Sequence, residues 1–394
     1  MIGLEHVIYV DYGRGRGDRG HRATNMRRPI MTNNITWVGM DDSAKTINLA
    51  IFKGQEINPR EELVVINDST GLGRMAKKLK TLPGEVRCVY EAGINGYYLQ
   101  RYLAKHEIAC DVAAPSLTPR RVGNRVKTDK LDAKALARLY RAGELTCIVI
   151  PQHEQESLRD LIRAREDALE DQLRARHRLA RFLMRRGWRY RDGKNWSQGH
   201  LRWVKSIRFE DDRDQMVLDE YRLTLSEQTE RLDRLNKKIE EVAKHPTYNT
   251  RVRYLMALKG IRVLTAMTII AEALDLRRFT DAPAFMAAIG VVPSEESSGE
   301  VERRGRITRT GNSHIRRVMI ESAWTYQHSS VSGKTVQNRR KGLPAEVLDI
   351  ARQCDKRLHQ KFRRMASRGK DRQKIAVAVS RELAGFVWAI GKVA

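Results

Sequence analysis

Hydrophobic and polar positions alternate along the first third of the chain in short stretches that are typical of β-strands. The alternation predicts strands over 35–40, 47–51 and 62–66, and the first of them ends at Asp41. Further along, the pattern predicts a helix over 71–79, a strand over 86–90 that ends at Glu91, a helix over 96–105 and a strand over 110–113. Three hairpin-like strands followed by alternating strands and helices outline an RNase H-like (RuvC-like) mixed sheet.

The middle of the chain follows a helical period instead. Apolar residues recur every three or four positions over 154–186, and again over 218–242 with steps of 3, 4 and 7. This spacing predicts either an antiparallel helical hairpin or a dimerising coiled coil. The connection between the two stretches carries four aromatic residues among cations. Such rings either stack on unpaired bases or pack the tip of the hairpin, and the pattern leaves both open. The four are Trp188, Tyr190, Trp196 and Trp203.

The remaining third is predicted to be helical around one loop. The stretch 258–266 resembles a helix-hairpin-helix, in which the turn at Gly260 offers backbone N–H groups to a phosphate. A helix that ends at a glycine before another helix gives the same string. These changes divide the chain into five parts. They are a basic N-terminal segment (1–31), a RuvC-like domain (32–150), a helical hairpin or coiled-coil segment (151–250), a serine-bearing helical domain (251–330) and a basic helical segment (331–394).

Composition narrows the class of partner. The 394 residues hold 74 Lys and Arg against 48 Asp and Glu, a formal net charge of +26. Such an excess favours a polyanion, and nucleic acid is the first candidate. No apolar run is long enough to span a membrane, and no signal peptide opens the chain. The four cysteines have no metal-binding spacing, which indicates reduced thiols in a cytosolic protein.

Four carboxylates form the first candidate site. Asp129 and Asp132 are three residues apart at the start of a predicted helix and therefore share one helix face. Mg²⁺ prefers such oxygen ligands, although acids in a first helical turn are also favoured by the helix dipole alone. Asp41 and Glu91 end two predicted strands, where the active sites of open α/β sheets gather. Together the four could hold two divalent ions for phosphoryl transfer.

A serine in a glycine-punctuated loop is the second candidate. Ser298 directly precedes Gly299, and the stretch 301–320 holds six arginines and one acid. Serine faced by Arg303, Arg304 and Arg306 could attack a phosphate while the cations neutralise the developing charge. An ordinary turn has the same composition, which leaves the structural alternative open.

In combination these motifs resemble one family of bacterial insertion-sequence transposases with a DEDD domain, relatives of the Piv-type DNA invertases and known as bridge-RNA-guided recombinases. The resemblance covers roughly residues 35–330 in the family's order. In the first domain it rests on Val38–Asp41, Tyr90–Gly93 and Lys127–Asp132. In the second domain it rests on Leu258–Ile261, Ala288–Gly290, Pro293–Glu295, Ser297–Gly299, Arg304–Thr308, Gly311–Asn312 and Arg316–Arg317.

The resemblance implies a composite site in which carboxylates bind Mg²⁺ and the serine forms a phosphoserine link to a DNA end. The carboxylates would be Asp41, Glu91, Asp129 and Asp132, and the serine would be Ser298. It further implies a homo-oligomer, a dimer or tetramer, whose protomers share active sites, and a non-coding RNA that selects donor and target DNA. The expected location is the bacterial cytoplasm, at the nucleoid. Nucleic acid is expected to contact Lys127, Gly260, Arg303, Arg304, Arg306, Arg316 and Arg317.

Two neighbours compete with these residues. Asp42 adjoins Asp41, but Asp41 keeps the Gly-x-Asp spacing and the phase of the strand. Ser297 adjoins Ser298, but only Ser298 directly precedes the glycine. Two other functions remain as alternatives: a RuvC-like nuclease that hydrolyses strands with metal-activated water, and a non-catalytic nucleic-acid-binding protein. The basic N-terminal segment, residues 1–31, is expected either to be disordered or to precede the true start at Met31, and it has no counterpart in the family.

Overall fold

The computed structural model describes residues 34–119, 129–298 and 301–394. Within these ranges the side chains of 129–131, 296–298 and 301–304 lie outside the description. The chain forms two compact units, residues 1–150 and 151–394. Each unit has its own hydrophobic core.

The first unit is built on a five-stranded mixed sheet with strand order β3-β2-β1-β4-β5. β1 is antiparallel to β2 and parallel to β4, which confirms the predicted RNase H-like arrangement. Its elements are β1 (Ile35–Asp42), β2 (Thr46–Lys53), β3 (Glu61–Ile66), α1 (Ser69–Lys80), β4 (Glu85–Glu91), α2 (Tyr98–Lys105), β5 (Ala109–Ala113) and α3 (Asp129–Ala142).

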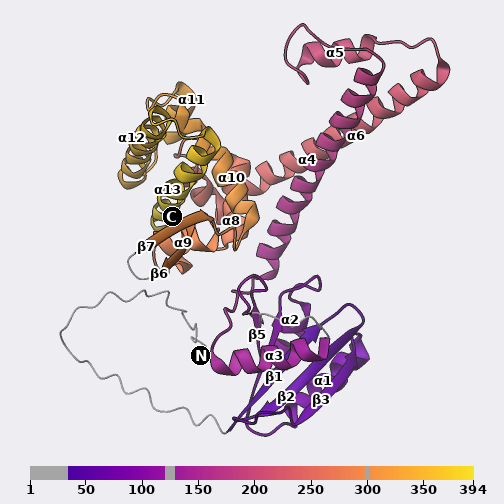
Figure 1. Cartoon of the computed structure of the whole chain (residues 1–394), viewed down its shortest axis with the longest axis vertical. Coiled ribbons are helices and arrows are strands. Elements are labelled where there is room, and N and C mark those ends of the chain that lie inside the picture. The colour runs from indigo at the N-terminus through magenta and orange to yellow at the C-terminus, as the bar shows by residue number, and fades with distance from the viewer. Residues whose placement is uncertain (1–33, 120–128, 299–300) are drawn as a thin grey trace. The chain divides into compact units, whose positions relative to one another are not determined.

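Helices cover both faces of this sheet (Figure 1). Val38 and Met40 of β1 lie in one core cluster together with Leu72 of α1. Trp37 lies in the cluster on the other face, with Ala133 of α3. Because side chains alternate along a strand, a central strand covered on both faces must be apolar at every position. Residues 35–40 of β1 are all buried, and the one polar side chain among them, Thr36, donates to the backbone oxygen of Pro83 at 2.6 Å.

A long helical hairpin, which we call the arm, begins the second unit (Figure 1). It consists of α4 (His153–Arg185), α5 (Gln198–Ser206) and α6 (Asp212–Ala243), and α4 alone is 33 residues, or about 50 Å, long. Arg165 pairs with Asn236 near the base, and Arg186 pairs with Asp214 near the tip, so α4 and α6 run antiparallel. Of the two alternatives predicted for these helices, the described chain adopts the intrachain hairpin.

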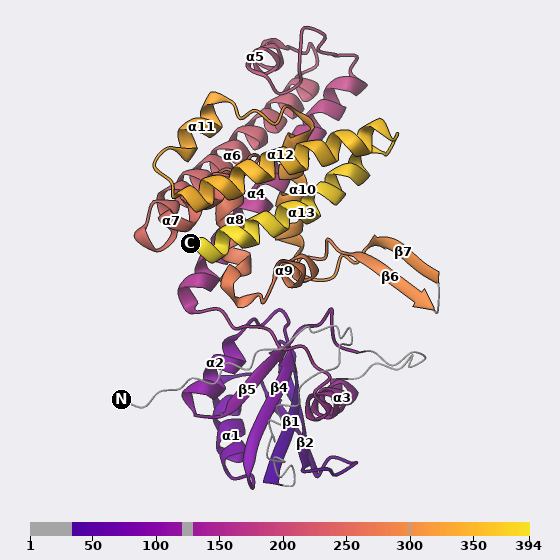
Figure 2. The same ribbon diagram turned by 90° about the vertical axis from the view of Figure 1, so that its left-hand side faces the viewer.

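Helices form most of the rest of the second unit, around one large core. Its elements are α7 (Pro246–Leu255), α8 (Val263–Ala273), η2 (Leu276–Arg278), α9 (Ala282–Ala288), β6 (Pro293–Ser298), β7 (Val301–Ile307), α10 (Ser313–Ala323), η3 (Trp324–Gln327), α11 (Lys334–Arg340), α12 (Ala345–Ser367) and α13 (Arg372–Val393). β6 and β7 pair with each other to form a hairpin that extends away from these helices (Figure 2). All four cysteines are free.

Candidate functional site

The carboxyl ends of β1 and β4 lie side by side at one edge of the sheet. The two strands are parallel, with Gly39 opposite Val89 and Met40 opposite Tyr90. Asp41 of β1 and Glu91 of β4 each directly follow the last pair of this register. The edge therefore carries two of the four predicted carboxylates on adjacent strands.

Gly39 allows α3 to pack directly on β1. A Cβ atom at this position would lie 2.0 Å from the carbonyl oxygen of Ala133, so only glycine fits. Trp37 contacts Tyr140 edge-to-face with ring centroids 5.4 Å apart, so α3 runs antiparallel to β1. Moving along β1 from Trp37 to Asp41 therefore leads toward the first turn of α3. That turn contains Asp129 and Asp132.

Strand alternation separates Asp41 from its neighbour Asp42. Trp37, Gly39 and Asp41 share the face of β1 that packs on α3, whereas Asp42 belongs to the opposite face. The Asp42 carboxylate accepts hydrogen bonds from Asn67 at 3.0 Å and from Asn95 at 2.9 Å. Burial raises the pKa of Asp42, and the two amide hydrogen bonds offset part of that increase. Asp42 is thus held by amides on the face away from α3.

The donor set fits a hard divalent cation. Carboxylate oxygens are the ligands that Mg²⁺ and similar ions prefer, and the predicted set contains four acids. Among the side chains that the structure describes, no three of the His, Cys, Asp and Glu type gather closely enough to hold a metal. The side chain of Asp129 lies outside that description. The fit therefore rests on the donor type and on the position of Asp41 and Glu91 on the face of the sheet that α3 covers.

Ser298 ends a β-strand, so the predicted loop at this position is wrong. Ser298 is the last residue of β6 and is paired in register with Val301 of β7. The strands were missed because a two-stranded hairpin buries no face and needs no alternation of apolar residues. Its base is fixed by backbone hydrogen bonds from Thr308 to Val292 at 2.9 Å and from Arg309 to Gly290 at 3.2 Å.

The predicted nucleic-acid contacts have different surroundings. Arg306 is exposed on β7. Arg316 donates to the backbone oxygen of Ile289 at 3.0 Å, and Arg317 donates to Glu166 and Glu321. The last two arginines therefore make internal contacts. Lys127 lies outside the described residues, and the side chains of Arg303 and Arg304, both on β7, lie outside the description.

Gly260 forms the turn between α7 and α8 with a positive φ of 86°. A Cβ atom there would lie 2.5 Å from the backbone oxygen of Ser322. The Ser322 hydroxyl donates to the Gly260 oxygen at 3.1 Å. A helix lies on each side of this turn, as predicted, and one side of the turn packs against α10.

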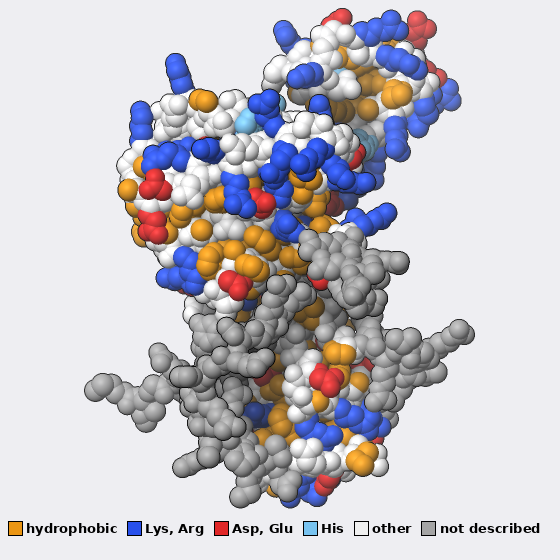
Figure 3. Space-filling view, turned by 60° about the vertical axis from the view of Figure 1, so that its left-hand side comes forward, with side chains coloured by type: hydrophobic (Ala, Val, Ile, Leu, Met, Phe, Trp, Pro, Cys, Tyr) orange, Lys and Arg blue, Asp and Glu red, His pale blue; other side chains and the backbone are white. Residues whose placement is uncertain are grey.

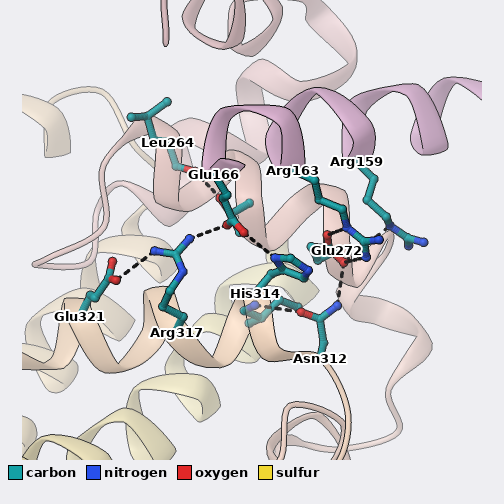
Figure 4. A network of polar contacts seen from close by, with 11 residues as sticks. Arg159, Arg163, Glu166, Leu264, Glu272, Asn312, His314, Arg317 and Glu321 are labelled. Carbon is teal, nitrogen blue, oxygen red and sulfur yellow. Dashed lines mark hydrogen bonds and ion pairs between the residues drawn. The ribbon is translucent and has the colours of Figure 1, made fainter. Parts of the chain in front are cut away.

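A buried glutamate, which the sequence analysis missed, joins the arm to α10, the helix that follows the β6–β7 hairpin (Figure 4). Glu272 of α8 accepts from Arg163 of α4 at 2.8 Å, pairs with Arg159 at 3.6 Å, and accepts from Asn312 at 2.7 Å. Asn312 is the N-cap of α10. Burial alone would raise the pKa of Glu272, but the hydrogen bonds and the cationic partners outweigh it and lower the pKa.

A second carboxylate reinforces this junction. Glu166 of α4 contacts His314 at 2.5 Å and also accepts from Arg317 (Figure 4). The partners lie about 150 residues apart in the sequence, so no local pattern predicts their meeting. One signal was available: Glu272 is the only charged residue in the otherwise apolar helix α8. A lone charge in an apolar helix indicates a buried ion pair.

The aromatic residues at the tip of the arm pack against one another. Trp188 contacts Trp203 with ring centroids 6.4 Å apart, and Tyr190 contacts Trp203 at 5.3 Å. Trp196 lies at 4.8 Å from the buried ring of His200. Of the two roles left open for these rings, the structure favours packing of the tip.

Comparisons with known proteins identify relatives over most of the chain. The sequence model of the "Transposase IS116/IS110/IS902 family" matches residues 252–337, and that of the DEDD transposase domain of IS110 matches residues 38–186. A putative transposase, y4qE, of Sinorhizobium fredii is 36% identical over 82% of this chain and 79% of its own length. The transposase for insertion sequence element IS1533 of Leptospira borgpetersenii is 30% identical over 85% of this chain and 97% of its own length. In the described ranges, no helix has the length and apolarity to cross a bilayer.

Proposed function

Because the chain belongs to the IS110/IS116/IS902 family of transposases, we propose that it cuts and rejoins DNA through a carboxylate-bound metal site and a serine nucleophile. Membership makes the protein a phosphoryl-transfer enzyme that acts on the DNA of an insertion sequence, with a DEDD domain that implies a divalent metal. The proposal adds the residues: Asp41, Glu91, Asp129 and Asp132 for the metal site, and Ser298 for the nucleophile.

One observation carries the carboxylate part of this proposal. Asp41 and Glu91 lie on adjacent parallel strands, on the sheet face that α3 covers at Gly39. A shift of either strand by one residue in its register would turn its acid to the other face of the sheet. The metal would be Mg²⁺, and it would polarise the phosphodiester and stabilise charge on its oxygens. The four carboxylates would hold the ion, and their hard oxygen atoms would disfavour softer metal ions.

The serine would exchange one ester bond for another. The Ser298 hydroxyl oxygen attacks the phosphorus, the bond from phosphorus to the deoxyribose oxygen breaks, and that oxygen leaves with the proton as a free DNA hydroxyl. Attack by a second DNA hydroxyl on the phosphoserine reverses the exchange and joins a new pair of ends. One phosphodiester replaces another at each step, so the protein needs no nucleotide cofactor. The exposed Arg306 supports the proposal as a cation on the same hairpin.

We also propose that a non-coding RNA selects donor and target DNA by base pairing, and that the carboxylates and Ser298 of one site come from different protomers of an oligomer. Support comes from the family resemblance and from the net charge of +26. RNA that copurifies from the native locus should match the ends of the element. Absence of such RNA, with recombination retained on purified DNA, would contradict the RNA part.

Covalent trapping tests the serine. With a nicked DNA substrate, the wild-type protein should yield a protein–DNA adduct that survives denaturation, and Ser298→Ala should yield none. Ser297→Ala is the matched control and should retain the adduct. Cleavage that continues in Ser298→Ala without any adduct would instead support the hydrolytic nuclease.

A further inference from the structure

The two halves of α4 use their arginines differently. In the half nearest the base, Arg163 pairs with the buried Glu272 and Arg165 donates to Asn236 at 2.9 Å. From Gln172 in the other half of α4 to Arg191, just beyond the end of the helix, the sequence holds eight arginines, one histidine and no acidic residue. The first set stabilises the fold. In the second set Arg174 pairs with Asp171 and Arg186 pairs with Asp214, and in the described part of the chain no carboxylate pairs with the other six arginines.

Four of these arginines form a stripe on the arm. Arg174, Arg178, Arg181 and Arg185 follow at steps of four, three and four residues, which places them on one helix face. All four are exposed. The stripe spans 11 residue steps, or about 16 Å at about 1.5 Å per residue. Successive members are thus about one helical turn apart.

The stripe faces away from the rest of the arm. Leu179 and Phe182 are buried in the core cluster between the helices of the arm, on the other side of α4. Arginine that can reach α6 is paired, as Arg186 is with Asp214. Within the part of the chain that the structure describes, Arg178, Arg181 and Arg185 make no hydrogen bond or ion pair. Like charges one turn apart destabilise a helix, so this face is suited to an external anion.

We propose that the stripe on α4 binds the phosphate backbone of double-stranded DNA. DNA is the substrate of the family, and a duplex rises about 3.4 Å per base pair, so the stripe would follow about five base pairs. The aromatic rings beside it pack against one another, which disfavours a single-stranded ligand whose bases need free rings to stack on. Figure 3 shows Lys and Arg side chains gathered at the end of the arm.

This surface is separate from the catalytic residues proposed above. It contains neither the carboxylates nor Ser298, and phosphate contacts carry no base sequence. The stripe would therefore position a duplex without selecting it. Binding should not require a divalent metal, and it should be seen in a protein that cannot form the serine adduct.

The salt dependence of DNA binding tests the proposal. The full-length chain with Ser298→Ala is titrated, in chelator and at several salt concentrations, onto a duplex of arbitrary sequence. The triple variant Arg178→Gln, Arg181→Gln, Arg185→Gln should make the negative slope of log K against log salt shallower by about 2.7, because each lost phosphate contact contributes about 0.9. Affinity at 0.1 M salt should fall by about two to three powers of ten.

Two further triple variants control for charge and folding. Arg234→Gln, Lys237→Gln, Lys238→Gln removes the same charge from exposed positions of α6, and should leave the slope nearly unchanged. Replacement of the three stripe arginines by lysine should keep the slope, because it keeps the charges. Unfolding curves of the stripe variants should match or exceed the wild type in stability.

Three results would overturn the proposal. One is an equal loss of slope in the α4 and α6 glutamine variants, which would indicate general electrostatics. Another is a loss confined to an RNA duplex of the same sequence. The third is an unchanged slope with loss of oligomeric mass, which would indicate that the stripe contacts a second copy of the chain.

Discussion

The carboxylates of the sheet, Asp41 and Glu91, and the β6–β7 hairpin that carries Ser298 are positioned by different physical means. Asp41 follows a central strand that is buried from Ile35 to Met40, and α3 packs directly on that strand at Gly39. Ser298 ends β6, which pairs only with β7 in the described part of the chain. Isolated two-stranded hairpins are marginally stable in water. The core therefore fixes one half of the proposed site, and hydrogen bonds at its base hold the other.

The largest difference should appear between two adjacent aspartates. Asp41→Asn should reduce DNA cleavage by at least about a thousandfold, because it removes a metal ligand from the α3 face. Asp42→Asn should cleave at close to the wild-type rate, because its amide oxygen can still accept from Asn67 and Asn95. Cleavage assays on one DNA substrate measure both. Equal loss in the two variants would contradict the assignment by strand face.

A second prediction tests the buried ion pairs between α4 and α8 in the unit that carries Ser298. Glu272→Gln should destabilise the second unit by about 3 kcal/mol or more, because Arg163 and Arg159 lose a buried charged partner. Thermal unfolding should show this as a shift in one of two transitions, since the chain has two compact units. Glu240→Gln on the exposed face of α6 is the control and should shift neither transition.

The effect of Glu272→Gln on stability should depend on pH in a defined direction. The folded-state pKa of Glu272 is lowered, so its stabilising effect is present above its ordinary pKa and is lost as pH falls through the folded value. The stability gap between the wild type and Glu272→Gln should therefore narrow below about pH 4.5. A gap that stays constant through acid pH would contradict the ion-paired state.

A third prediction tests the sheet half without touching a carboxylate. Gly39→Ala should destabilise the first unit by about 1 to 3 kcal/mol, because the new methyl group meets the backbone of Ala133 and Ala137. It should shift the unfolding transition that Glu272→Gln leaves unchanged. Gly73→Ala in α1 is the matched control. Its nearest neighbour is the Tyr102 hydroxyl at 3.8 Å, so it should be neutral or stabilising.

The smallest effect is expected in the stability of Asp42→Asn. The folded-state pKa of Asp42 is raised by burial, so the charged form is disfavoured once pH rises through that value. Asp42→Asn should therefore gain stability relative to the wild type as pH rises, by less than about 1 kcal/mol. Unfolding measured between acid and neutral pH would show this trend. The opposite trend would indicate that a cation stabilises the Asp42 carboxylate.

Sequence patterns predicted the sheet well because burial dictates its residues. All five strands and the helix at Asp129 were located, and the phase of the first strand favoured Asp41 over Asp42. The strand ending at Ser298 could not be predicted, because a two-stranded hairpin does not need the alternation of apolar residues by which strands are recognised. The contact of Glu272 with Arg163 could not be predicted either, since 109 residues separate the two partners. Pairings of that kind depend on tertiary packing.

We propose that the carboxylates and Ser298 divide the work of one active site and come from different protomers. Mixing Asp41→Asn protein with Ser298→Ala protein, under conditions that exchange subunits, tests this division most directly. Each variant alone should fail to form the DNA adduct. The mixture should recover it, because a mixed oligomer pairs intact carboxylates with an intact serine. A mixture that exchanges subunits, as measured by mass, yet stays as inactive as either variant would contradict the shared site.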